Sequence, residues 1–308
     1  MQRWMAVAGV LLPVLASEAR GQQIPRFSTG TDLVVLSATA VDRNGRPVRD
    51  LRPEEVRIYE EGRPQRLEHF TVGRQTSARM LLLVDASGSM GDQRKSASSR
   101  MAAVQILSAL DANDEVALAG FDHRYWGVVA FTREHQRVLA KFDELQPFGS
   151  TALHDALDKA ARDLASHGEG RRAVVVITDG VDTSSQRAAE EVIARSRALD
   201  VPIYAVSVLS PLDDPASNRF VGRETTPAAT AGAAVLARYA KLSGGAAFGV
   251  SDFRGLREAA AQIVAELKHQ YRLGYDPPDG PRRFRRVEVR TTRKGVYVRT
   301  RSGYVPPS

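Results

Sequence analysis

The chain has 308 residues, of which 43 are Lys or Arg, 36 are Asp or Glu and 43% are hydrophobic, and its net charge is +7. This length allows one large domain or two of ordinary size, and the apolar fraction excludes a wholly disordered chain. Because there is no cysteine, the sequence excludes disulfides, thiolate zinc sites, iron–sulfur clusters and cysteine nucleophiles, so any metal must bind oxygen or imidazole.

The first 21 residues are predicted to be a secretory signal peptide. Arg3 supplies the basic start, and Trp4–Ala16 is an uncharged, mostly apolar run. Ala19 and Gly21 have the small-residue spacing of a cleavage site. The run is shorter than the roughly 20 apolar residues that a permanent membrane helix needs, and no second long run follows. We therefore expect a protein exported to the periplasm or beyond, with no transmembrane helix in the mature chain; a buried N-terminal helix is the alternative.

Residues 24–76 are predicted to be β structure. Turn residues at Arg43–Arg46 and Glu61–Gly62 separate extended runs, which indicates two hairpins. Two hairpins of this size need a further surface to cover one face. The runs are 33–36, 38–41, 56–59 and 67–72.

From residue 77 onward, continuous apolar runs alternate with helical periods. The runs are typical of strands that are buried on both faces, and the alternation indicates βαβ units in a doubly wound, mostly parallel sheet. The short connection after residue 121 joins 116–121 to 127–131 as an antiparallel pair at the sheet edge. The buried runs are 80–84, 174–177 and 203–208. The predicted helices cover 101–110, 153–164, 192–199 and 253–267, the last with Asp252 as its N-cap.

Two further segments interrupt or follow this pattern. Residues 209–229 show no period and many turn formers, so they are predicted to be a long loop. Residues 273–308 return to strand alternation around a turn at Arg293–Gly295, which predicts a C-terminal hairpin packed with the N-terminal strands. The expected organisation is therefore a signal peptide (1–21), an N-terminal β segment (24–76), an α/β domain (77–272) and this hairpin (273–308).

Oxygen-bearing side chains follow three predicted turning points of the α/β domain. Asp85, Ser87 and Ser89 come directly after one buried strand, Asp179 follows another, and Thr151 precedes a helix. The carboxyl ends of parallel strands share one edge of the sheet, so these side chains are expected to converge there. Two carboxylates and three hydroxyls suit a hard divalent cation. So few negative charges would leave the cation an open, electrophilic position that a partner's carboxylate can fill.

The run Asp85-Ala86-Ser87-Gly88-Ser89, with Thr151 and Asp179, resembles the metal-ion-dependent adhesion site of von Willebrand factor type A (VWA) domains. The order of strands and helices resembles that family over roughly 77–272. The resemblance implies a Mg²⁺ (or Mn²⁺) site formed by Asp85, Ser87, Ser89, Thr151 and Asp179, and a protein partner that presents an Asp or Glu. It also implies that Asp85 anchors the cation, that the hydroxyls are ligands, and that Asp179 completes the sphere or orients a water.

The flanking segments carry a second resemblance. DRNGRPVRDLRPEEVRIYEEGRPQRLEHF near the N-terminus and YRLGYDPPDG, RRVEVRT and RSGY near the C-terminus are similar to exported VWA-related proteins of acidobacteria. That group implies no particular partner.

An enzyme is the main alternative to a binding module. A Mg²⁺ site at the end of a parallel sheet could serve hydrolysis or phosphoryl transfer, but no P-loop, G-x-G-x-x-G or G-x-S-x-G motif is present. Nothing in the sequence supports the geometry of a triad of Ser87, His154 and an aspartate. His154 is expected to be a solvated helix residue. A structural envelope protein that does not use the metal is the third possibility. We therefore expect a protein that is not an enzyme.

The basic residues are concentrated in 281–301, which has nine Lys or Arg and one acid, Glu288. The favoured interpretation is a hairpin with a solvated charged face. The alternative is a patch for an anionic envelope polymer or lipid headgroups over Arg282–Arg301. Nucleic acid is not an expected partner, because no nucleic-acid-binding motif accompanies the patch. Asp122 and Asp182 also lie near strand ends and are expected to be turn residues or to hold the ligands in place.

Overall fold

The computed structural model describes residues 33–72, 77–168, 170–208, 227–250 and 252–306, with the backbone alone for 227–230. The predicted signal peptide and most of the predicted loop 209–229 lie outside these residues, so both stay predictions. Across the described part of the chain, no helix combines the length and the apolar character that a membrane span requires.

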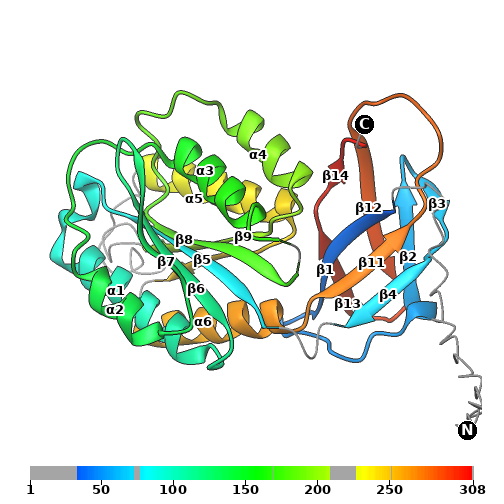
Figure 1. Cartoon of the computed structure of the whole chain (residues 1–308), viewed down its shortest axis with the longest axis horizontal. Helices are drawn as coiled ribbons and strands as arrows, with labels where there is room; N and C mark the ends of the chain where they lie inside the picture. The colour runs from blue at the N-terminus through cyan, green and yellow to red at the C-terminus, as the bar shows by residue number, and fades with distance from the viewer. Residues whose placement is uncertain (1–32, 73–76, 169, 209–226, 251, 307–308) are drawn as a thin grey trace, which may run out of the picture. The chain divides into compact units, whose positions relative to one another are not determined.

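A six-stranded sheet forms the centre of the α/β part, in the order β10-β9-β8-β5-β6-β7 (Figure 1). All neighbouring strands are parallel except β6 and β7, which are antiparallel at one edge. The predicted doubly wound sheet with one antiparallel edge strand is therefore confirmed. The strands are β5 Arg79–Asp85, β6 Glu115–Phe121, β7 Tyr125–Thr132, β8 Arg172–Thr178, β9 Ile203–Val208 and β10 Ala247–Val250.

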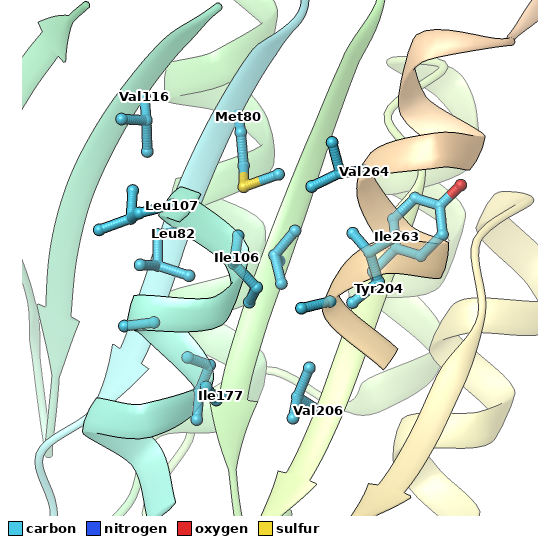
Figure 2. Close-up of a cluster of buried hydrophobic side chains, with 14 of the residues drawn as sticks. Met80, Leu82, Ile106, Leu107, Val116, Ile177, Tyr204, Val206, Ile263 and Val264 are labelled. Carbon is cyan, nitrogen blue, oxygen red and sulfur yellow. The ribbon is translucent and has the colours of Figure 1, made fainter. Parts of the chain in front are cut away.

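Helices cover both faces of this sheet, which explains why its strands are apolar without alternation. Helices α1, α2 and α6 lie on one face and α3, α4 and α5 on the other (Figure 1). Met80 and Leu82 of β5 pack against the first group, whereas Leu81 and Leu83 pack against the second. Figure 2 shows the first of these two cores, in which Ile106 of α1 packs with the strand residues. The helices are α1 Gln93–Ala109, α2 His135–Phe142, α3 Leu153–Ala165, α4 Ala189–Ala198, α5 Pro227–Ser243 and α6 Phe253–Lys268.

Four of these six helices were predicted from their apolar periods: α1, α3, α4 and α6. Asp252 caps α6 as expected, because its side chain accepts a hydrogen bond from the backbone N–H of Gly255. Apolar periodicity did not predict α2, which has only eight residues, or α5, whose many alanines make its apolar stripe hard to recognise. The last three residues of the predicted loop 209–229 belong to α5.

The remaining strands form two four-stranded antiparallel sheets, ordered β13-β1-β11-β4 and β14-β12-β2-β3 (Figure 1). Side chains from both sheets share one apolar core, which includes Leu36 of β1, Ile58 of β2, Leu273 of β11 and Val287 of β12. Strands from the two ends of the chain thus lie side by side. They are β1 Val34–Asp42, β2 Val56–Glu60, β3 Arg63–Gln65, β4 His69–Val72, β11 Tyr271–Tyr275, β12 Arg285–Thr291, β13 Val296–Thr300 and β14 Gly303–Tyr304.

Two predicted pairings in these sheets are wrong. β12 and β13 do not form a hairpin within 273–308, because β12 pairs with β2 and β14 while β13 pairs with β1. The run 67–72 does not pair with 56–59 either; β2 pairs with β3 across the Glu61–Gly62 turn, and β4 pairs with β11. Alternation identifies which face of a strand is buried, but it does not identify the partner strand.

Candidate metal-binding site

Three loops meet at the carboxyl edge of the six-stranded sheet. β5 ends at Asp85 and continues into a 3₁₀ turn over Gly88–Gly91, while the neighbouring β8 ends at Thr178. Val84 lies opposite Ile177 in the parallel register, so the residues that follow each strand emerge side by side. The Thr178 hydroxyl donates to Asp85 Oδ2 at 2.5 Å and ties the two strand ends together.

Asp85 is a buried carboxyl group, 3% exposed. Its Oδ1 accepts a hydrogen bond from the backbone N–H of Ser87 at 2.9 Å, in addition to the Thr178 bond on Oδ2. Burial raises the pKa of Asp85 to about 6, because desolvation disfavours the charged form more than these hydrogen bonds favour it. A cation held beside this carboxyl would stabilise its ionised form.

The loop that carries the two serines is fixed against the loop that carries Thr151. The Ser87 and Ser89 hydroxyl oxygens lie 3.1 Å apart, and the Gly88 N–H donates to the Gly149 carbonyl at 2.9 Å. A Cβ atom on Gly88 would lie 3.1 Å from the Gly149 oxygen, so glycine permits this close approach.

Thr151 is held by its backbone. Its N–H donates to the Thr183 hydroxyl at 2.9 Å, and its carbonyl accepts from the N–H groups of Thr183 and Ser184. The side chain is buried, at 4% exposed, and among the described residues its hydroxyl makes no hydrogen bond. The hydroxyl is therefore available to a ligand.

Asp179 forms an ion pair that the sequence analysis missed. Lys95 of α1 donates to Asp179 Oδ2 at 3.0 Å, and both side chains are mostly buried, at 15% and 8% exposed. The Val181 N–H lies 3.4 Å from the other carboxylate oxygen. A lysine in the first turn of a helix is unfavourable beside the positive end of the helix dipole. This signal was not available from the sequence, because the helix was predicted only from residue 101.

Gly180 lets the third loop pass close to α5. Its φ is +84°, and a Cβ atom there would lie 2.9 Å from the backbone of Gly232. Both the backbone conformation and the space therefore require glycine.

His154 differs from its prediction as a solvated residue. Its side chain is 12% exposed, and its Nδ1 lies 3.0 Å from the Tyr239 hydroxyl of α5. This contact has no signal in the sequence, because apolar periodicity does not predict α5. Asp182 accepts from the Ser185 hydroxyl and Asp122 from the Arg124 N–H, so both act as the expected turn residues.

The arrangement does not resemble a serine nucleophile. The Ser87 hydroxyl has the Ser89 hydroxyl as its neighbour, and the His154 ring faces Tyr239 and Asp182. Within the described residues, no three His, Asp or Glu side chains gather as a metal cluster. The predicted ligand set has only two carboxylates, and its other members are three hydroxyls.

The basic segment 281–301 is largely engaged with acids of the protein itself. Each of five arginines has at least one carboxylate partner. The favoured interpretation predicted a solvated charged face, but Arg285 and Arg301 are buried. These contacts leave fewer charges for an anionic polymer than the sequence suggested. The pairs are Arg285–Glu60, Arg290–Glu288, Arg293–Asp50, Arg293–Glu55, Arg299–Glu266 and Arg301–Asp200.

Comparison with known proteins gives one family match. The family model described as the von Willebrand factor type A domain matches residues 80–181, which include the five candidate ligands. No curated protein is similar enough in sequence to count as a match.

Solved structures share the fold at low sequence identity. A von Willebrand factor type A protein from Catenulispora acidiphila is 13% identical, with a TM-score of 0.51 over 91% of this chain and 75% of its own. Proximal thread matrix protein 1 from the mussel byssus is 17% identical, with a TM-score of 0.50 over 68% of this chain and 51% of its own. At such identities, these likenesses establish the fold alone.

Proposed function

We propose that the protein is a divalent-metal-dependent protein-binding module of the adhesion type, because the family model of the von Willebrand factor type A domain matches residues 80–181. Asp85, Ser87, Ser89, Thr151 and Asp179 would hold Mg²⁺ or Mn²⁺. A bound cation would supply an electrophilic position that accepts a carboxylate oxygen from an Asp or Glu of the partner. The module would comprise residues 77–272, with the flanking strands as an accessory β domain.

The buried carboxyl of Asp85 carries this proposal. It is 3% exposed at the end of β5, where it accepts a hydrogen bond from the Thr178 hydroxyl at the end of β8. Burial raises its pKa and so disfavours its charged form. Oxygen donors of this kind suit a hard cation. The chain's own residues fix the carboxyl through the Ser87 N–H and the Thr178 hydroxyl, and they leave the Thr151 hydroxyl free to bind.

The charge of the site supports an acidic partner. Asp85 and Asp179 contribute two negative charges when ionised, and Lys95 contributes one positive charge. With a divalent cation the group would carry a net single positive charge, so a carboxylate is the favoured ligand. The positive charge of Lys95 therefore adds to that of the cation in attracting the carboxylate of an approaching partner.

We also propose that the protein is exported, with residues 1–21 as the signal peptide. The apolar run and the small-residue spacing before residue 22 support this proposal. Mass spectrometry of the N-terminus of the protein recovered outside the cytoplasm tests it, and a chain that starts at Met1 would contradict it.

Thermal unfolding in EDTA, Mg²⁺ and Mn²⁺ tests the metal site. Cation at tenfold excess over its Kd stabilises a native protein by about 1.4 kcal/mol, which raises Tm by about 2–4 °C. We expect this rise in the native chain and its loss in Asp85→Ala. Asp122→Asn is the matched control, because Asp122 is also a buried strand-end carboxylate but lies outside the motif. Equal Tm values in EDTA and metal for the native chain would favour a structural protein that does not use the metal.

A further inference from the structure

Phe148 is a large apolar side chain that projects from the Thr151 loop into solvent. It is 74% exposed, more than the other exposed aromatic side chains described, which include Tyr297 at 58%. A single exposed aromatic residue needs no explanation by itself, since apolar atoms make up much of any protein surface. The position of Phe148, rather than its exposure alone, suggests a function.

The backbone around Phe148 is fixed directly against the candidate metal loop. The Phe148 N–H donates to the carbonyl of Ala86 at 2.8 Å, and Ala86 lies between Asp85 and Ser87. On the other side, the Gly149 carbonyl accepts from the Gly88 N–H at 2.9 Å. The side chain therefore projects from a backbone that is bonded to the D-x-S-x-S loop.

A third contact holds the same loop to the Asp179 side of the site. The Ser150 hydroxyl donates to the Ser184 hydroxyl at 2.9 Å. Because hydrogen bonds on both sides already order this segment, the loop loses little conformational entropy when a partner covers Phe148. Aromatic side chains presented in this way are typical binding anchors.

We propose that the partner presents an Asp or Glu together with an apolar side chain. Phe148 binds the apolar side chain, while the carboxylate would coordinate the bound cation. This inference rests on the proposed function and adds a specificity-determining residue to it. Two residues lie between Phe148 and Thr151, so their Cα atoms are at most about 10 Å apart. An extended peptide covers that distance in about three residues, so the apolar side chain lies within three positions of the acid.

The proposal selects a peptide over an anionic polymer as the occupant. A polymer of phosphates or uronic acids could supply the negative charge, but it has no apolar group to cover the Phe148 ring. A polypeptide with an acid beside Leu, Ile, Val or Phe supplies both groups.

Selection from a displayed library of random peptides tests the proposal. Peptides are captured on the immobilised full protein in Mg²⁺ and eluted with EDTA. We expect enrichment of sequences with an apolar residue within three positions of an Asp or Glu. A selected peptide and its apolar→Ser version are then synthesised, and fluorescence polarisation gives their Kd values for the native protein, Phe148→Ala and the control Tyr297→Ala.

Phe148→Ala is expected to weaken binding of the selected peptide by about tenfold, because an apolar contact is lost. It should leave the Kd of the apolar→Ser peptide unchanged, since that peptide makes no such contact. Tyr297→Ala should bind both peptides like the native chain, because Tyr297 lies on β13. An unchanged Tm in Phe148→Ala confirms that folding is not affected.

Two outcomes overturn the proposal while leaving metal-dependent binding intact. One is a selection that enriches acids without apolar neighbours. The other is a Phe148→Ala protein that keeps the full preference for the apolar residue. A different result identifies failure of the proposed function: peptides that remain bound in EDTA and bind Asp85→Ala as well as the native chain.

Discussion

Replacing Lys95 with methionine removes a positive charge beside Asp179 but keeps most of the length of the side chain. The ammonium lies 3.0 Å from Asp179 Oδ2, and neither side chain is more than 15% exposed. A cation that uses Asp179 as a ligand must either displace this ammonium or tolerate its repulsion. We therefore expect Lys95→Met to bind Mg²⁺ more tightly than the native chain.

The size of the effect follows from the geometry of the ion pair. At 3.0 Å, the Coulomb attraction between unit charges is about 1.4 kcal/mol in water and about 5.5 kcal/mol at an effective dielectric constant of 20. Desolvation offsets part of this attraction, so the net cost of breaking the pair is roughly 1–3 kcal/mol. That cost corresponds to a Kd for Mg²⁺ that is about 5- to 150-fold lower in Lys95→Met.

Calorimetric titration of Mg²⁺ into the metal-free proteins measures this change. Arg94→Met is the matched control, since Arg94 is an exposed cation on the same turn of α1. It should change the Kd far less than Lys95→Met. Weaker Mg²⁺ binding in Lys95→Met would refute competition and would show instead that Lys95 holds Asp179 in a binding orientation.

Two predictions concern the β sandwich. Glu60 is 2% exposed and accepts hydrogen bonds from Tyr275, Tyr304 and Arg285, so Glu60→Ala is expected to cost about 3–5 kcal/mol of unfolding free energy by leaving a buried cation unpaired. Urea unfolding measures this cost, and a loss below about 1 kcal/mol would contradict it. Hydrogen bonds from Arg293 lower the pKa of Glu55 from 4.5 to about 2. Because the folded pKa lies below the unfolded one, this pair stabilises the protein above pH 4.5 and the contribution is lost as pH falls towards 2. The Tm difference between the native chain and Glu55→Gln should therefore shrink over that interval; a constant difference would exclude the pair as its cause.

The α/β part of the fold was predictable because burial on both faces leaves a clear pattern. The runs that became β5, β8 and β9 are continuous and apolar, and the short connection between β6 and β7 permits only an antiparallel pair. The β sandwich was less predictable. β12 and β13 follow each other in sequence, yet they join different sheets, and no alternation pattern distinguishes that outcome from a hairpin.

The same contrast holds for the site. The meeting of the Asp85 loop with the end of β8 follows from the topology of a parallel sheet, so motif spacing was enough to anticipate it. Lys95 and Phe148 were missed for a different reason. The position of Lys95 depends on the 3₁₀ turn over Gly88–Gly91 and on the Asp92 cap, and that of Phe148 on backbone hydrogen bonds to Ala86. Neither contact has a signature in residue spacing.

The pairing of β1 with β13 has a consequence for the order of folding. Ala38 lies opposite Thr300, so this ladder joins residues that are separated by nearly the whole chain. The strands β5 to β10 and their helices, in contrast, are contiguous in sequence and can assemble as soon as residue 268 is available. Because pairings between distant residues form slowly, the sandwich is expected to close last. Until then β1 keeps an unpaired edge, and that interval is when the newly made protein is most vulnerable to aggregation.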